Sequence, residues 1–358
     1  MSAPSLEKTP VRRRLLWAVI GLVGGGILAG LIALVVILSG AFDVAATSGH
    51  SAPVALLLHF TMERSVAARA PHLTPPDLDD PALILRGATH YATGCAPCHG
   101  GPGELASPIA QQMTPVPPGL YDAARDFTPD ELFWIVKHGV KMTAMPAWPA
   151  QGRDDEIWAM VAFLRHLPTV KTAGYAKLTG LAGGPGFLDG GVTRAAGEPR
   201  PFDPAPCSRC HGADGQGREG AFPRLAGLGT AYLIDALRAF RDGSRPSGFM
   251  QPVAASLTDA QITAAARYFS GLPAARVVVP AAPPAAAEKC VACHRPPNGA
   301  PQSGVPDLAG QPPDYLATQL RLLASGERPS QVRRAHQVPA DAIAALTRYL
   351  SATATPAP

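Results

Sequence analysis

The pentapeptide Cys95-Ala-Pro-Cys98-His99 occurs again as Cys207-Ser-Arg-Cys210-His211 and as Cys290-Val-Ala-Cys293-His294. These three copies of Cys-x-x-Cys-His contain all six cysteines of the 358-residue chain. On a helix the two thiols lie on one turn, where each can form a thioether with a vinyl group of the same porphyrin. The histidine that follows then lies under the ring, with an imidazole nitrogen facing the iron. The repeated motif therefore predicts three covalently bound c-type haems.

Other uses of paired cysteines fit these motifs poorly. A zinc site needs two such pairs at one metal, or one pair followed by spaced histidines. A disulfide or a thioredoxin-like redox pair requires no histidine directly after the second cysteine. We therefore assign one haem to each motif. The predicted thioether residues are Cys95, Cys98, Cys207, Cys210, Cys290 and Cys293, and the predicted proximal iron ligands are His99, His211 and His294.

The N-terminal segment predicts a membrane anchor. Three arginines at positions 12–14 precede an uncharged run from Leu15 to Ser39. As a helix this run measures about 37 Å, longer than a hydrocarbon core of about 30 Å. The positive-inside rule keeps the arginines in the cytoplasm. We expect residues 1–42 to form a cytoplasmic stub and a single span of a bacterial inner membrane, with the haem-binding part in the periplasm. The alternative is a signal peptide cleaved near positions 41–46, although its apolar region is usually only about 7–15 residues long.

Composition narrows the remaining possibilities. The chain is 47% hydrophobic and 16% charged, with a formal net charge of +4. It has no concentrated basic stripe of the kind that binds nucleic acid, so we expect no nucleic-acid partner. Residues 43–80 are expected to be a membrane-proximal connector, in which positions 56–70 are compatible with a short amphipathic helix at the bilayer surface.

Residues 81–170, called repeat one, carry helix signals on both sides of the first motif. A helix is expected over residues 80–91, with a proline in its first turn. Thr128 is a predicted N-cap, because a proline and then a glutamate follow at the first and third helical positions. Residues 154–165 have acids in the first turn and apolar side chains at helical spacing. The sequence therefore predicts an all-helical unit around the first haem.

Repeat two (residues 201–275) and repeat three (residues 288–354) are similar to each other. Gly243-Ser-Arg-Pro-Ser247 in repeat two parallels Gly326-Glu-Arg-Pro-Ser330 in repeat three. Each repeat also ends in a predicted helix with apolar residues at helical spacing. These helices cover residues 257–268 and 338–349.

These features resemble the class I cytochrome c family, whose fold is all-α with terminal helices that cross beside the haem. The resemblance implies three tandem class I domains behind one transmembrane helix, with Gly87 and Tyr91 at the helix crossing of repeat one. Repeats two and three resemble the two-domain dihaem cytochromes c. In that family a proline carbonyl orients the proximal imidazole, and Pro223 and Pro306 match this proline.

Two linkers separate the repeats. The first, residues 171–200, is long and rich in glycine, whereas the second, residues 276–287, is short and rich in proline and alanine and hence stiff. We therefore expect repeats two and three to move together and repeat one to be more independent.

The resemblance also implies a methionine on the distal side of the iron, a soft ligand that favours Fe(II) and raises the potential. The family places this ligand directly before a proline, which selects Met145 in repeat one and leaves Met142 to pack near the haem. Met250 is the single methionine of repeat two and its predicted distal ligand.

Repeat three lacks this ligand, because no methionine follows Met250. Alignment with repeat two places Gln331, or with a small shift Arg333, at the equivalent position. His336 is the nearest residue able to bind iron. Two alternatives stay open. His294 and His336 together give a low-potential bis-histidine haem, or an open distal site leaves the iron five-coordinate.

The sequence predicts an electron-transfer protein and not an enzyme. Iron with protein ligands on both faces has no vacant position for a substrate, and tandem domains keep the haems close to one another. The expected partners are respiratory redox proteins, from a quinol-oxidising complex or a dehydrogenase to a terminal oxidase or reductase. The alternatives are a cytochrome subunit of a periplasmic dehydrogenase complex, as in three-haem subunits of membrane-bound alcohol dehydrogenases, and a gas-binding or peroxidase-like protein that uses an open third haem.

Overall fold

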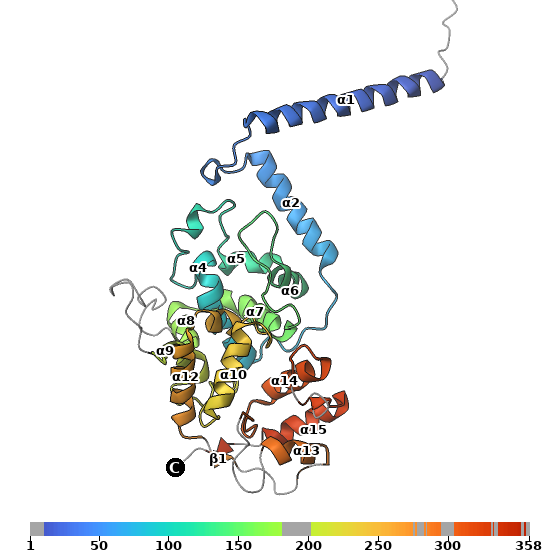
Figure 1. The fold of residues 1–358 in the computed structure, drawn as a ribbon. Helices are drawn as coiled ribbons and strands as arrows, with labels where there is room; N and C mark the ends of the chain where they lie inside the picture. The colour runs from blue at the N-terminus through green and yellow to red at the C-terminus, as the bar shows by residue number, and fades with distance from the viewer. Residues whose placement is uncertain are drawn as a thin grey trace, which may run out of the picture. The chain divides into compact units, whose positions relative to one another are not determined.

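The computed structural model describes residues 11–180, 202–274, 276–277, 283, 285–294, 304–330, 332, 336–351 and 354–355. Within these ranges the regular secondary structure is almost entirely helical (Figure 1). The α-helices are α1 (Val11–Ser39), α2 (Ala52–Arg69), α3 (Pro81–His90), α4 (Ala96–His99), α5 (Leu120–Ala123), α6 (Pro129–His138), α7 (Asp154–His166), α8 (Thr172–Thr179), α9 (Ala205–His211), α10 (Thr230–Arg241), α11 (Met250–Ala255), α12 (Asp259–Gly271), α13 (Ala285–His294), α14 (Pro313–Ser325) and α15 (Ala340–Leu350). The remaining elements are the short helices η1 (Ala46–Ser48), η2 (Tyr91–Cys95, of π type), η3 (Ala110–Gln112), η4 (Ala124–Asp126) and η5 (Leu167–Thr169), and the strands β1 (Arg276–Val277) and β2 (Ala354–Thr355).

The chain divides into two compact units, residues 1–54 and 55–358. In the first unit, α1 contains the candidate membrane span Arg13–Ser39, within which an 18-residue window has a mean hydropathy of 2.6. Its length and composition are sufficient to cross a membrane. A signal sequence near the N-terminus would have the same properties, so the uncleaved anchor stays a prediction.

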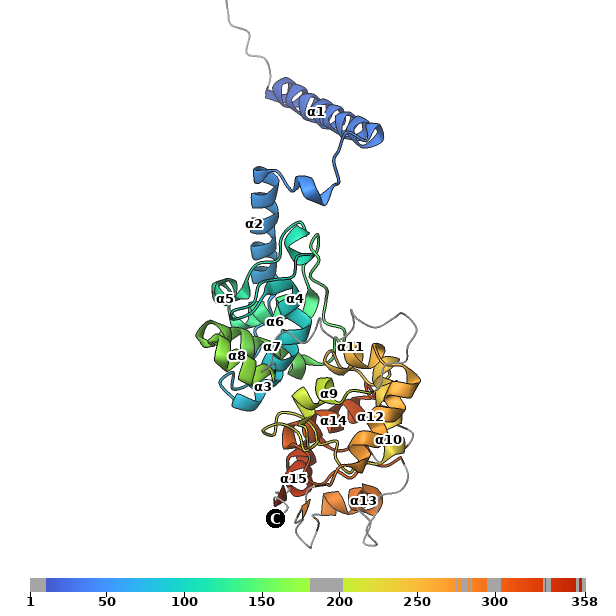
Figure 2. The ribbon, with the colours of Figure 1, turned by 90° about the vertical axis from the view of Figure 1, so that its left-hand side faces the viewer.

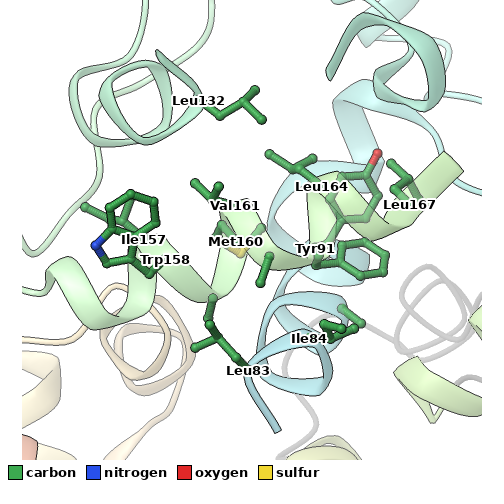
Figure 3. Close-up of a cluster of buried hydrophobic side chains, with 14 of the residues drawn as sticks. Leu83, Ile84, Tyr91, Leu132, Ile157, Trp158, Met160, Val161, Leu164 and Leu167 are labelled. Carbon is green, nitrogen blue, oxygen red and sulfur yellow. The ribbon is translucent and has the colours of Figure 1, made fainter. Parts of the chain in front are cut away.

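The core of repeat one forms where α3 crosses α7 (Figure 3). Gly87 makes the crossing possible, because a Cβ added there would lie 2.0 Å from the carbonyl oxygen of Ala159. Tyr91 is fully buried, packs on Phe163 with ring centroids 5.1 Å apart, and donates a 2.7 Å hydrogen bond to the Gly100 carbonyl. The helix crossing implied by the class I resemblance is therefore confirmed.

Local capping explains where the helices of repeat one begin. The carboxylate of Asp80 accepts a hydrogen bond from Ala82 N at 2.9 Å, and a proline occupies the first turn of α3. At the start of α6, Thr128 and Glu131 form a reciprocal capping box. The Asp80 cap and the capping box both accept hydrogen bonds from backbone amide groups that the first helical turn leaves free. The predicted starts of both helices are confirmed.

Repeats two and three use a similar order of helices. In repeat two, α10 packs against α11 and α12, as the ribbon in Figure 2 shows. In repeat three, α15 packs against α13 and α14. The strands β1 and β2 form an antiparallel pair in which Arg276 is opposite Thr355. Parts of both predicted linkers, including residues 181–201, lie outside the described residues.

Repeat one packs directly on repeat two. Leu85 of α3 is buried in one cluster with Ala221 and Phe222 of repeat two. Arg218 of repeat two donates a 3.1 Å hydrogen bond from Nη1 to the carbonyl of Leu178 in α8. Repeats one and two therefore share buried contacts in spite of the long linker. That repeat one is the more independent in its motion stays a prediction.

Candidate haem-binding sites

The six predicted thioether cysteines lie in helical segments that end in the proximal histidines. The first pair spans the junction of η2 and α4, and the other pairs lie in α9 and α13. Burial raises the pKa of Cys95 to about 12 and that of Cys207 to about 11. Within the described ranges, no three His, Cys, Asp or Glu side chains gather as a metal cluster.

The three predicted proximal histidines have the same hydrogen bond. The Nδ1 atoms of His99, His211 and His294 lie 2.8, 2.9 and 2.8 Å from the carbonyls of three prolines. A carbonyl only accepts, so Nδ1 donates and Nε2 keeps its lone pair. Burial lowers the pKa of all three histidines, which favours the neutral imidazole that binds metals. The proline partners are Pro118, Pro223 and Pro306.

The loop of repeat one that contains Met142 and Met145 is fixed by backbone hydrogen bonds at both ends. Val140 N donates to the carbonyl of Met145 at 3.2 Å, and Trp148 N donates to that of Lys137 at 3.0 Å. Met145 is half-buried, whereas Met142 is 80% exposed and has a φ of 61°. Of the two, Met145 is thus the one with a structured backbone on either side. Its role as an iron ligand stays a prediction.

Met250 begins a helix of its own, α11, instead of lying in a loop before α12. Its amide donates a 3.0 Å hydrogen bond to Ser247 Oγ, which therefore acts as a cap for the start of this helix. The side chain of Met250 is half-buried. This arrangement fixes the backbone that presents the predicted ligand.

In repeat three, His336 faces His294. The two imidazole centroids are 6.1 Å apart, with an angle of 47° between the rings. Metal–imidazole bonds of about 2.0–2.1 Å on opposite sides of one ion separate the ring centroids by about 6 Å. Ser330 Oγ lies 2.7 Å from His336 Nδ1, so Nε2 remains for a metal. The alternative positions 331 and 333 lie outside the described residues.

Two arginines, Arg245 buried and Arg328 half-buried, lie where repeat two meets repeat three. Arg245 is 5% exposed, and its Nη2 donates to Tyr315 OH at 2.7 Å. Its Nε is buried without a hydrogen-bond partner. Burial and the nearby Arg245 lower the pKa of Arg328. Within the described part of the chain no carboxylate pairs with either arginine, and buried cations are normally paired. The site therefore suits an anion, such as the carboxylates that a haem carries.

Several of these groups were missed in the sequence. Pro118 lies among several prolines, and the sequence does not show which of them contacts His99. Only the folded loop brings the Pro118 carbonyl to the His99 ring. Ser247 and Ser330 occupy equivalent places in the parallel segments of repeats two and three, and this was the available signal. The parallel positions of Arg245 and Arg328 gave the same kind of signal. The pairing of these side chains across repeat boundaries depends on tertiary structure.

Comparison with known proteins finds relatives that are cytochromes c or electron acceptors. Residues 82–164 match the family described as cytochrome c oxidase, cbb3-type, subunit III, and residues 201–273 match the cytochrome c family. The chain is 37% identical over 139 residues to the thiosulfate dehydrogenase electron acceptor of Stutzerimonas stutzeri, covering 34% of this chain and 64% of that protein. It is 32% identical over 168 residues to cytochrome c4 of Pseudomonas aeruginosa, covering 42% and 78%. The solved structure of Acidithiobacillus ferrooxidans cytochrome c4 is 30% identical and covers 41% of this chain and 98% of its own, with a TM-score of 0.35.

Proposed function

The chain belongs to the class I cytochrome c family, and on that premise we propose that it is a membrane-anchored periplasmic electron carrier with three covalently bound haems. One haem would be attached to each of the repeats at residues 81–170, 201–275 and 288–354. The observation that carries the proposal is the threefold recurrence of one arrangement: a Cys-x-x-Cys-His turn whose histidine Nδ1 is bonded to a proline carbonyl.

The residues around each predicted haem would hold it in a closed site. When bound, the haem supplies reversible one-electron chemistry at its iron. Met145, Met250 and His336 are the proposed distal ligands, opposite His99, His211 and His294. Arg245 and Arg328 would hold haem carboxylates between repeats two and three. Iron with two protein ligands favours electron transfer over chemistry on a substrate.

We further propose that the electron donor is a periplasmic dehydrogenase of the thiosulfate-oxidising kind. Support comes from the similarity to the Stutzerimonas stutzeri electron acceptor. The acceptor would be a terminal oxidase, in keeping with the match of residues 82–164 to an oxidase subunit family. An anchored carrier of this type would remain at the membrane surface between the two partners.

The number of haems is the first test. The full-length protein, matured in a host that attaches c-type haems, is expected to have a mass larger than that of the polypeptide by three haems. Replacement of both Cys290 and Cys293 with serine should remove one haem, because both thioethers of the third motif are lost. Denaturing mass spectrometry measures this directly. A wild-type protein with two haems would contradict the assignment of the third motif.

The donor is tested by reduction kinetics. The oxidised holoprotein, mixed with a thiosulfate dehydrogenase and thiosulfate, is expected to become reduced, as seen in its visible absorption bands. Omission of the dehydrogenase should leave it oxidised, and dithionite should reduce it in either case. If reduction instead requires a quinol-oxidising complex and quinol, the protein is a carrier with a different donor.

A further inference from the structure

The carboxylate of Glu156 is buried where repeat one meets repeat two. It lies in the first turn of α7 and is 2% exposed. Its Oε1 accepts from Ser247 Oγ at 2.5 Å and pairs with Arg153 Nη1 at 3.0 Å. Its Oε2 accepts from Gly248 N at 2.6 Å and from Trp148 Nε1 at 3.1 Å. Three of these four partners can only donate, so both oxygens accept hydrogen bonds, while burial raises the pKa of this carboxyl group. Each oxygen therefore joins a donor of repeat one to a donor of repeat two.

The donors from repeat two belong to the segment directly before Met250. Arg153, which also pairs with the carboxylate, donates from Nη1 to the carbonyl of Pro246 at 2.8 Å. Gly248 packs so closely on Trp148 that an added Cβ would lie 2.2 Å from the indole nitrogen. This segment thus lies against repeat one through both its backbone and its side chains.

Ser247 connects the carboxylate to the predicted ligand. Its hydroxyl has one hydrogen, which it donates to Glu156, and its oxygen accepts from Met250 N at 3.0 Å. Phe249 stacks on His90 of α3 with ring centroids 4.6 Å apart. Every residue from Pro246 to Phe249 therefore contacts repeat one.

We propose that Glu156 is a positioning residue for the distal ligand of the second haem, acting from repeat one across the repeat boundary through Ser247 on Met250. This inference rests on the proposed assignment of Met250 as an iron ligand. The equivalent serine of repeat three, Ser330, contacts His336 of its own repeat. The same serine thus supports the distal ligand in both repeats, and only in repeat two is it bonded to Glu156.

The test uses the full-length ferric holoprotein and imidazole as a competing ligand. Imidazole displaces a distal methionine and abolishes the weak far-red absorption band of methionine-ligated ferric haem. A titration with imidazole therefore gives one step for each such haem, and the step of the second haem is the one that M250A lacks. In E156Q one carboxylate oxygen is replaced by an amide NH2 group, which faces two donors and cannot accept from them. The segment before Met250 is then held less firmly, so imidazole should displace Met250 at about tenfold lower concentration. S247A should move the same step in the same direction. E131Q, a glutamate replacement in the exposed capping box of α6, should leave it unchanged.

The outcomes separate the inference from the function on which it rests. A shift of the second-haem step in both E156Q and S247A, larger than any shift of the first-haem step, supports the inference. If M250A removes one step but E156Q and S247A leave it in place, the inference is overturned and the ligand assignment stands. If M250A removes no step, the ligand assignment fails and the inference fails with it. S247A also provides the answer if E156Q does not fold.

Discussion

Replacement of His336 with methionine is expected to raise the midpoint potential of the third haem by on the order of 0.1–0.3 V. A thioether favours Fe(II), whereas a second imidazole stabilises Fe(III) better, so the exchange should move the potential of the proposed third haem towards those of the two haems with proposed methionine ligands. His336 lies opposite His294 at the separation that two imidazoles on one metal require. A spectroscopic redox titration of the full-length protein should show one low-potential step in the wild type and its upward shift in the variant. The exposed His166 replaced with methionine is the control.

Removal of the His336 imidazole is a second test of this residue as the iron ligand. His336→Ala should change one haem from low-spin to high-spin in the ferric state and allow CO to bind when reduced, because the distal position opens. S330A should keep the ligand but loosen its orientation, since Ser330 contacts Nδ1 and not the nitrogen left for the metal. An unchanged spectrum in His336→Ala would overturn the assignment of His336 as the ligand. A wild-type protein that binds CO at a haem lost in the Cys290 and Cys293 double variant would show that the third haem is open and would favour a gas-binding function.

The parts of the fold that were predictable are those that local sequence determines. The capping box of Thr128 and Glu131 and the start of the helix near Asp80 depend on residues within one helical turn, and both predictions are confirmed. The proximal histidines follow their cysteines directly, and their proline partners in repeats two and three were implied by the family resemblance. A family resemblance supplied the crossing at Gly87.

The parts that were not predictable depend on contacts between repeats. The glycine-rich composition of residues 171–200 gave no indication that Leu85 would be buried against Phe222. Glu156 looked like one of three acids in the first turn of a helix, which is a favourable place for any carboxylate. Only the tertiary structure distinguishes it from its two neighbours, because two of its bonding partners, Ser247 and Gly248, lie 91 and 92 residues further along the chain.

The largest expected effect on stability is that of Gly87→Ala. The added Cβ would lie 2.0 Å from the Ala159 carbonyl oxygen and 2.7 Å from Phe163 Cβ, so α3 and α7 must separate. Overpacking of a core usually lowers the free energy of unfolding by about 1–3 kcal/mol. Because the added Cβ meets backbone atoms, which cannot rotate away, we expect a loss of about 3 kcal/mol in this variant. Gly174→Ala in α8 is the matched control, because its nearest neighbour is an ordinary contact at 3.9 Å, and it should stabilise by about 0.5 kcal/mol.

Unfolding of repeat one can be followed separately in the whole protein. Three of the four tryptophans, Trp134, Trp148 and Trp158, lie in this repeat, and the nearby haem quenches their fluorescence until the repeat opens. Denaturant titration of Gly87→Ala should give a lower midpoint for the fluorescence transition, and Gly174→Ala a slightly higher one. Loss of less than about 1 kcal/mol in Gly87→Ala would mean that the two helices can separate at little cost. The close crossing would then not be what stabilises the first haem-binding unit.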